Sequence, residues 1–306
     1  PRFQDGSLRG VLVRATGTGA LGVVLLSATE FLPRERAVAE AIGALGAAAV
    51  WVNWLPTPKA HAGTLPTRVD AFDAAQLLGP HTRGVYGEDR LIEELHGIRY
   101  RVSPASFFQT SRFGAEQLVA TVDRLAGPLE GHTVIDGYCG SGLLSLALAR
   151  RAAAVVGVED DEEAVADAER AARDNGLANV RFVAGAAQRI LRTLAAERPH
   201  LVVLDPPRAG CHVGVLDAVA HDLRPDEVLY VACDVQSLAR DAAELERLEY
   251  AVHEVQPIDM FPWTHHVETV ARFVRNPQLR TGRKRFSRAA GERLLAKARA
   301  QPRTAP

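Results

Sequence analysis

The sequence contains little that would mark a secreted, membrane-spanning or metal-cluster protein. It has three cysteines in 306 residues, Cys139, Cys211 and Cys233, and no two of them form a CxxC pair. We therefore expect a reducing compartment, which is the cytoplasm or, alternatively, an organelle. We expect neither a metal site nor an iron–sulfur cluster. The longest run near the N-terminus without a charged or strongly polar residue, 42–52, is too short to cross a bilayer.

A leader sequence and abundant lysine are also lacking. The chain opens on Pro1 without a charged-then-apolar stretch, so we expect no signal peptide. Only three of the 36 basic residues are lysine, and we assign no function to that bias. What is present is 47% apolar residues, enough for a sizeable core, in a length that predicts two domains.

Charge is unevenly distributed along the chain. Residues 277–306 hold nine Arg or Lys and one acidic residue, Glu292, a net charge of +8. Because the whole chain carries −1, residues 1–276 carry −9. This basic tail is either a solvated, partly helical end or a sequence-independent contact with nucleic acid phosphates.

Residues 1–100 are predicted to form a small α+β domain. The stretches 8–14 and 21–27 predict a β-hairpin, 34–45 a helix and 47–54 a strand. Residues 55–85 contain several Pro and Gly and predict loops, and 88–100 predicts two short strands around a turn at Gly97. Nothing in this part indicates a chemistry.

Residues 101–276 predict alternating strands and helices. The strands are expected at 133–136, 154–159, 180–183, 201–205 and 228–233, followed by an antiparallel pair at 253–259 and 267–274; helices are expected at 115–125, 143–151 and 162–175. This alternation is typical of an α/β, doubly wound, mainly parallel sheet. Ligands bind at the carboxyl ends of such strands, where the sequence places Asp136, Glu159, Asp205 and Cys233.

A glycine-rich loop follows the first strand of this sheet. The segment Asp136-Gly-Tyr-Cys-Gly-Ser-Gly142 lacks the GxGxxG spacing of dinucleotide sites. An acid followed by CGxG instead suits S-adenosylmethionine, which has no pyrophosphate to bind. Glu159, 23 residues after Asp136, can accept hydrogen bonds from both ribose hydroxyls. The alternative for the loop alone is a tight turn.

Two further strand ends carry reactive or charged groups. In Asp205-Pro-Pro-Arg208, the prolines restrict the backbone, and Arg208 suits a phosphate or base edge. An aromatic residue at that position would suit amino-group methylation, which we therefore do not expect. Cys233 ends its strand where a nucleophile would face the cleft, although burial for packing is the common role of such a cysteine. The pair His265-His266 lacks a third spaced ligand, so no metal site is expected.

Together these motifs resemble the RNA (uracil-5-)-methyltransferases, which make 5-methyluridine in tRNA or ribosomal RNA. The resemblance covers residues 98–275 and rests on the order of Ser103-Pro104, Phe107-Phe-Gln109, Tyr138-Cys-Gly-Ser-Gly142, Val156-Gly-Val-Glu159, Asn175-Gly-Leu177, Asp205-Pro-Pro-Arg-Ala-Gly210, Tyr230-Val-Ala-Cys233, Asp259-Met-Phe-Pro262 and His266-Val-Glu268. DPPRAG followed by His212 is most similar to the tRNA uridine-54 type.

The resemblance implies a seven-stranded methyltransferase sheet in 101–276, an RNA-contacting first domain and a monomer with no membrane association. It implies that Cys233 adds to uracil C6 and that Glu268 removes the C5 proton. It further implies cofactor contacts and RNA contacts. The cofactor contacts would be Gln109, Tyr138, Gly140, Gly142, Glu159 and Asp205, and the RNA contacts Arg208 and Phe107. The RNA would be tRNA, with ribosomal RNA as the alternative.

The sequence departs from the family pattern in several places near these motifs, one of them Thr110-Ser111 after Phe-Phe-Gln109. Asp234 follows the nucleophile where relatives have Asn, and would disfavour a thiolate unless it points away. Ala186 stands near where many methyltransferases place an acid for adenine, and Leu143 replaces a polar residue. Three hypotheses follow: an active uridine C5-methyltransferase, a non-catalytic RNA-binding protein of the same fold, or a methyltransferase for small molecules or proteins.

Overall fold

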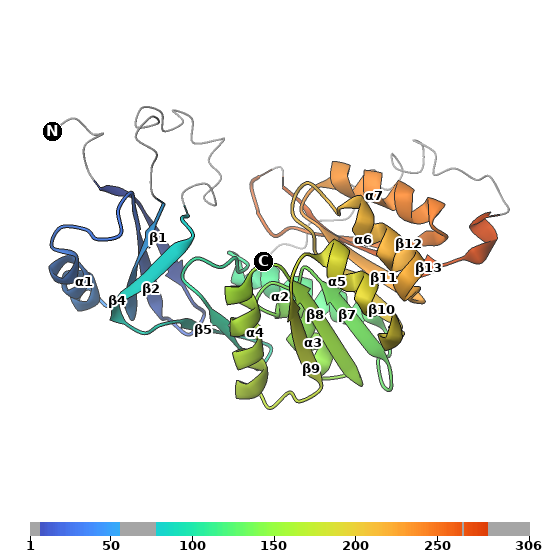
Figure 1. Cartoon of the computed structure of the whole chain (residues 1–306), viewed down its shortest axis with the longest axis horizontal. Coiled ribbons are helices and arrows are strands. Elements are labelled where there is room, and N and C mark those ends of the chain that lie inside the picture. The colour runs from blue at the N-terminus through green and yellow to red at the C-terminus, as the bar shows by residue number, and fades with distance from the viewer. Residues whose placement is uncertain (1–6, 56–77, 265, 281–306) are drawn as a thin grey trace. The chain divides into compact units, whose positions relative to one another are not determined.

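A computed structural model describes residues 7–55, 78–264 and 266–280 (Figure 1). The chain divides into two compact units: the described parts of Pro1–Glu94 with Arg99–Phe107, and those of Leu95–Ile98 with Phe108–Pro306. No helix among the described residues has the length and apolarity needed to cross a membrane.

The first unit is built on a four-stranded sheet in the order β1-β2-β3-β4. Its elements are β1 (Leu8–Ala15), β2 (Leu21–Ser27), α1 (Glu35–Ala44), β3 (Ala49–Trp54) and β4 (His81–Gly87). β5 (Leu91–Leu95) and β6 (Ile98–Val102) form a separate pair. The predicted hairpin, helix and paired strands are confirmed. The prediction that residues 55–85 form loops was wrong at β4, whose polar, glycine-containing sequence lacks an apolar run. Residues 56–77 lie outside the described residues.

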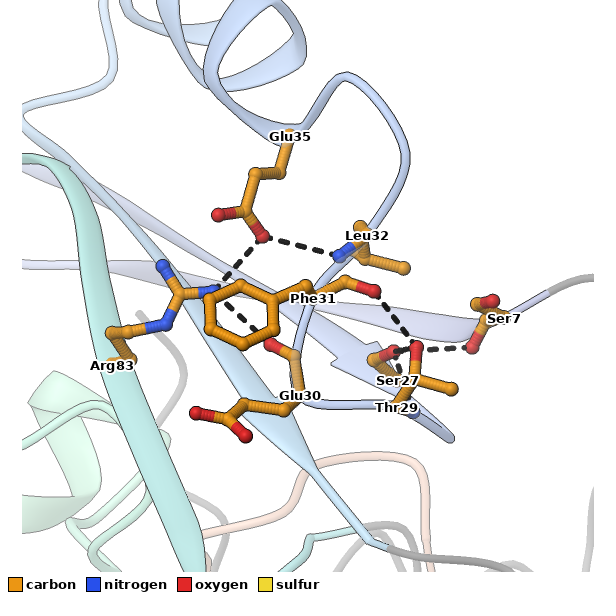
Figure 2. A network of polar contacts seen from close by, with 8 residues as sticks. All are labelled: Ser7, Ser27, Thr29, Glu30, Phe31, Leu32, Glu35 and Arg83. Carbon is orange, nitrogen blue, oxygen red and sulfur yellow. Dashed lines mark hydrogen bonds and ion pairs between the residues drawn. The ribbon is translucent and has the colours of Figure 1, made fainter.

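One polar network holds the connection between β2 and α1 (Figure 2). The Arg83 guanidinium donates to the Glu30 carbonyl oxygen at 3.0 Å and to Glu35 Oε2 at 2.9 Å. Arg83 also lies over the Phe31 ring, 4.8 Å from its centroid, as Figure 2 shows. Phe31 is therefore held in place although 62% of it is exposed.

The second unit is a seven-stranded sheet in the order β12-β13-β11-β10-β7-β8-β9. Its strands are β7 (Thr133–Gly137), β8 (Ala154–Glu159), β9 (Val180–Ala184), β10 (Leu201–Leu204), β11 (Glu227–Ala232), β12 (Tyr250–Ile258) and β13 (Glu268–Arg275). The five strands from β11 to β9 are parallel, and β13 runs antiparallel to both β11 and β12. The predicted doubly wound, mainly parallel α/β sheet is confirmed.

Helices cover both faces of this sheet (Figure 1). They are α2 (Arg112–Ala126), α3 (Leu143–Ala149), α4 (Glu162–Asp174), α5 (Ala187–Thr193), α6 (Val213–Ala218) and α7 (Val235–Arg247), with short turns η3 (Ala195–Glu197), η4 (Val219–Leu223) and η5 (Pro277–Arg280). Polar side chains cap several of them: Ser111 accepts from Gly114 N, and Asp161 accepts from Glu163 N. Central strand residues such as Val202, Leu204 and Tyr230 have no exposed surface. A rigid core therefore fixes the positions of the strand ends.

Candidate active site

The carboxyl ends of the parallel strands place the candidate residues along one edge of the sheet. Cys233 directly follows β11, and Glu268 is the first residue of β13. The antiparallel register pairs Ala232, the last residue of β11, with Thr269, and extending it by one residue puts Cys233 opposite Glu268, whose charge adds to burial in raising the pKa of the Cys233 thiol. Side chains that face each other in this way have Cβ atoms about 4.5–5.5 Å apart. Two residues 35 positions apart are thus brought together.

Burial and like charge raise the pKa values of this pair. Glu268 is 4% exposed, and desolvation, followed by the charge of Asp205, raises its pKa to about 7. Burial also raises the pKa of the partly buried Cys233 thiol, and Glu268 and Asp205 raise it further, whereas Arg208 lowers it. The Glu268 carboxyl therefore keeps its proton to a higher pH than a glutamate in water, and so does the Cys233 thiol.

Asp234 acts as the cap of the helix that follows the cysteine. Its Oδ2 accepts from Ser237 N at 2.8 Å, and the Ser237 hydroxyl donates to its carbonyl oxygen at 2.9 Å. A carboxylate at a helix N-terminus is stabilised by the backbone N–H groups and the helix dipole. The acidic groups that raise the pKa of Cys233 are Glu268 and Asp205. Asp234, which stands where relatives have Asn, instead uses its carboxylate to cap α7.

Asp205 lies between the cysteine and the glycine-rich loop. It follows β10, and its backbone N donates to the Gly137 carbonyl oxygen at 3.2 Å. Desolvation raises the pKa of its carboxyl to about 7. On the neighbouring strand, the pKa of the fully buried Asp136 is also raised to about 7, chiefly by burial and in part by Asp205. Together with Glu268, three acidic side chains along this edge thus retain protons near neutral pH.

A hydrogen bond from Gly140 to Glu159 ties the glycine-rich loop to the carboxyl end of β8. Gly140 N donates to Glu159 Oε2 at 2.9 Å, while Oε1 accepts from Asp160 N and Asp161 N. Gly142 has a φ of +88°, and a Cβ there would lie 3.1 Å from Ala168 Cβ. Position 142 therefore favours glycine, because α3 begins there in close contact with α4.

This edge fits S-adenosylmethionine by its charge and its donor set. A carboxylate offers about four acceptor positions, so Glu159 with three hydrogen bonds keeps one for a ribose hydroxyl. Asp136 Oδ2 accepts from the Ser145 hydroxyl at 2.6 Å, but its buried Oδ1 has no partner among the described residues. The charge of Asp205 raises the pKa of both Asp136 and Glu268, and a cationic sulfonium would relieve that repulsion.

The remaining predicted residues have varied positions. Tyr138 is partly buried with a φ of +67°, and burial raises the pKa of its hydroxyl, which lies beside Cys211. Arg208 is exposed, and Gln109 is partly exposed in the segment before α2. Phe107 belongs to the other unit and is 71% exposed.

Two other departures from the family pattern lie at helix starts. Leu143 is buried at the start of α3, and Ala186 precedes α5 without a side-chain cap.

A buried polar network next to the cysteine was missed in the sequence. Asp241 Oδ2 on α7 accepts from the Tyr230 hydroxyl at 2.5 Å and from Cys211 N at 2.7 Å. Arg240 donates to Asp241 Oδ1 and, at 2.7 Å, to the Ala209 carbonyl oxygen. The network fixes the end of the segment that begins with Asp205. The sequence signals only Tyr230, through its place in the cysteine motif.

Comparison with known proteins places these observations in a family context. Residues 85–275 match the model of the tRNA (uracil-5-)-methyltransferase family. An uncharacterized RNA methyltransferase of Gloeobacter violaceus is 45% identical over 65% of this chain and 43% of its own length. One from Halalkalibacterium halodurans is 36% identical over 87% of this chain and 56% of its own. The chain spans about half the length of the curated relatives it matches.

A solved structure is similar over most of the chain. It is the Pyrococcus abyssi tRNA (uracil-54, C5)-methyltransferase in complex with S-adenosyl-L-homocysteine, 26% identical, with a TM-score of 0.69 over 88% of this chain and 60% of the other. The Pyrococcus abyssi protein Trm5b matches 90% of this chain with a TM-score of 0.51 at 14% identity, which shows the fold alone.

Proposed function

Because this chain belongs to the tRNA (uracil-5-)-methyltransferase family, we propose that it methylates carbon 5 of uridine in structured RNA, with S-adenosylmethionine as methyl donor. The family resemblance expected from the motifs is confirmed. tRNA is the favoured substrate, since the similar archaeal structure is of a tRNA uracil-54 enzyme. Ribosomal RNA and a non-catalytic RNA-binding role are the alternatives that the experiment below separates.

The pairing of Cys233 with Glu268 carries this proposal. A thiol and a carboxyl face each other across β11 and β13, and the pKa of the carboxyl is about 7. A general base works best when its pKa is near the working pH. Uracil C5 needs a nucleophile to activate it and a base to deprotonate it, and this pair supplies one of each.

The residues perform the reaction in a balanced sequence. The Cys233 thiol loses its proton to solvent, its sulfur forms a bond to uracil C6, and the electrons of the C5–C6 double bond move to give an enolate over C5 and O4. S-adenosylmethionine, when bound, would supply the electrophilic methyl group to C5, its sulfur–methyl bond breaking to leave S-adenosylhomocysteine. The Glu268 carboxylate then removes the C5 proton. The C6–sulfur bond breaks, the double bond returns, and the thiolate leaves.

The neighbouring residues position the reactants. Glu159 would accept from the ribose hydroxyls, while Tyr138, Gly140, Gly142, Gln109 and Asp205 would complete the cofactor site. Arg208 lowers the pKa of Cys233, and we assign it an RNA phosphate as well, with Phe107 a contact from the first domain. A base paired in a helix is out of reach of this edge, so the uridine must be flipped out. The domain at 1–100 and the basic tail would bind RNA backbone.

Mass spectrometry of an unmodified tRNA transcript tests the proposal. The transcript is incubated with the protein and S-adenosylmethionine, digested to nucleosides and analysed for 5-methyluridine. We expect one methyl on a uridine with the wild type and none with Cys233→Ala. Methylation by Cys233→Ala would refute the mechanism. No methylation of tRNA, followed by none of ribosomal RNA, would leave the RNA-binding alternative.

A further inference from the structure

Trp263 projects from the loop that leads directly into Glu268. The loop, residues 259–267, joins β12 to β13 at the sheet edge that carries Cys233. Trp263 is 98% exposed, the largest exposed fraction among the large hydrophobic side chains of the described residues. Exposed tryptophan is unusual, because burial of the indole ring would stabilise the fold.

The backbone at this residue is also unfavourable for tryptophan. Thr264 N donates to the Phe261 carbonyl oxygen at 3.1 Å, which closes a four-residue turn with Pro262 second and Trp263 third. Trp263 has a φ of +69°, the left-handed conformation that this position of a type II turn demands and that favours Gly or Asn. Neither packing nor backbone preference therefore explains a tryptophan here.

The turn holds this side chain at the surface through fixed contacts. The Thr264 hydroxyl donates to the Phe261 carbonyl oxygen at 2.8 Å, and His266 N donates to that hydroxyl at 3.2 Å. Met260, 1% exposed, anchors the loop in the fold. A Cβ added at Gly114 would lie 2.5 Å from Met260 Cγ, so the loop packs tightly on the first turn of α2. The indole is thus presented from a rigid base.

We propose that Trp263 stacks on an unpaired RNA base beside the flipped uridine. This inference rests on the proposed function for the identity of the nucleic acid. Aromatic side chains recognise single-stranded nucleotides by stacking on their faces, which requires an exposed, rigidly placed ring. Arg208, exposed and close enough to influence Cys233, provides a cation for the accompanying phosphate. The exposed Phe113, next to Gly114, is a second ring on the adjoining segment.

Three variants test this assignment. Trp263→Asn removes the ring but suits the left-handed backbone, whereas Trp263→Phe keeps a smaller ring. Val213→Ala is the control, an exposed apolar residue of the same unit to which no RNA contact is assigned. Affinity for a tRNA transcript is measured by filter binding, folding by thermal denaturation, and indole accessibility by acrylamide quenching, with Trp263→Phe as the fluorescence baseline.

We expect Trp263→Asn to weaken RNA binding by roughly five- to a hundredfold, with a smaller loss for Trp263→Phe. The melting temperature of Trp263→Asn should be equal to or above that of the wild type, and RNA should protect the wild-type indole from acrylamide. Unchanged affinity with an unprotected indole overturns the inference, as does an equal loss of affinity in Val213→Ala. Methylation by the wild type is scored separately: RNA binding that depends on Trp263 without methylation would refute the proposed function alone.

Discussion

Asp136 should make the protein less stable as the pH rises, and Asp136→Asn should remove that effect. Asp136 is fully buried, and its pKa is raised from 3.8 to about 7, mainly by desolvation. Between these values the unfolded chain has an ionised carboxylate while the folded protein retains the proton. The stabilisation from the protonated acid is thus complete below pH 3.8 and is lost as the pH rises through about 7.

The size of this effect follows from the pKa shift. One pKa unit corresponds to about 1.4 kcal/mol, so a shift of about 3 units costs on the order of 4 kcal/mol above pH 7. From pH 5 to pH 8 the loss is about 3 kcal/mol. Asparagine resembles the protonated acid: it still meets the Ser145 hydroxyl, and it places a polar group at the unpartnered Oδ1 position, as the protonated carboxyl also does. The two proteins should therefore be nearly equal at low pH.

Urea denaturation at pH 5 and pH 8 measures this difference. The free energy of unfolding of Asp136→Asn, relative to the wild type, should increase by about 3 kcal/mol between the two pH values. Asp160→Asn, which removes an exposed acid directly after β8 at the same edge, should give no such increase. Parallel pH dependence in the wild type and Asp136→Asn would show that Asp136 is ionised in the fold, and would refute the reasoning.

Other predictions concern the reacting pair and its support. In a single turnover, the rate at which 5-methyluridine is released from the protein should rise with pH through about 7, because Glu268 must be ionised to take the C5 proton after methyl transfer; a flat release profile from pH 6 to 8 would exclude it as the base. Asp241→Asn should raise KM for RNA in a protein that is still folded, as a thermal melt would show, since the segment 205–210 loses its anchor. An unchanged KM would refute that role. Gly210→Ala should destabilise the fold by about 1–3 kcal/mol in urea denaturation, because its φ is +84° and a Cβ would lie 2.6 Å from Asp241 Oδ2; a fully stable variant would contradict this packing.

Much of the second unit could be predicted because its strands are short apolar runs bounded by clear breaks. The runs at β7 and β8 carry an acid at or next to their carboxyl ends, so the sequence alone indicates which edge of the sheet holds the candidate residues. The helices α5, α6 and α7 were not predicted. α5 and α6 are only seven and six residues long, so helical periodicity has little room to develop in them. β4 was missed because His81, Arg83 and Gly84 hide its strand character.

The sequence indicates some features of the candidate site, and others depend on the fold. The positions of Cys233 and Glu268 in motifs indicated their roles through family resemblance, but their facing arrangement depends on the β11–β13 register, which sequence does not display. The cap role of Asp234 depends on where α7 begins. The buried carboxylate of Asp241 has no sequence signature, because its partners come from a strand, a loop and its own helix.

The most direct test of the Cys233–Glu268 mechanism is the intact mass of Glu268→Gln after incubation with a tRNA transcript and S-adenosylmethionine. Without the base, the C5 proton remains and the thiol cannot be eliminated. The account predicts a denaturation-resistant protein–RNA complex, with the methylated nucleotide attached to Cys233, and no such complex in Glu268→Gln carrying Cys233→Ala. Full release of 5-methyluridine by Glu268→Gln, or a complex that persists without Cys233, would contradict it.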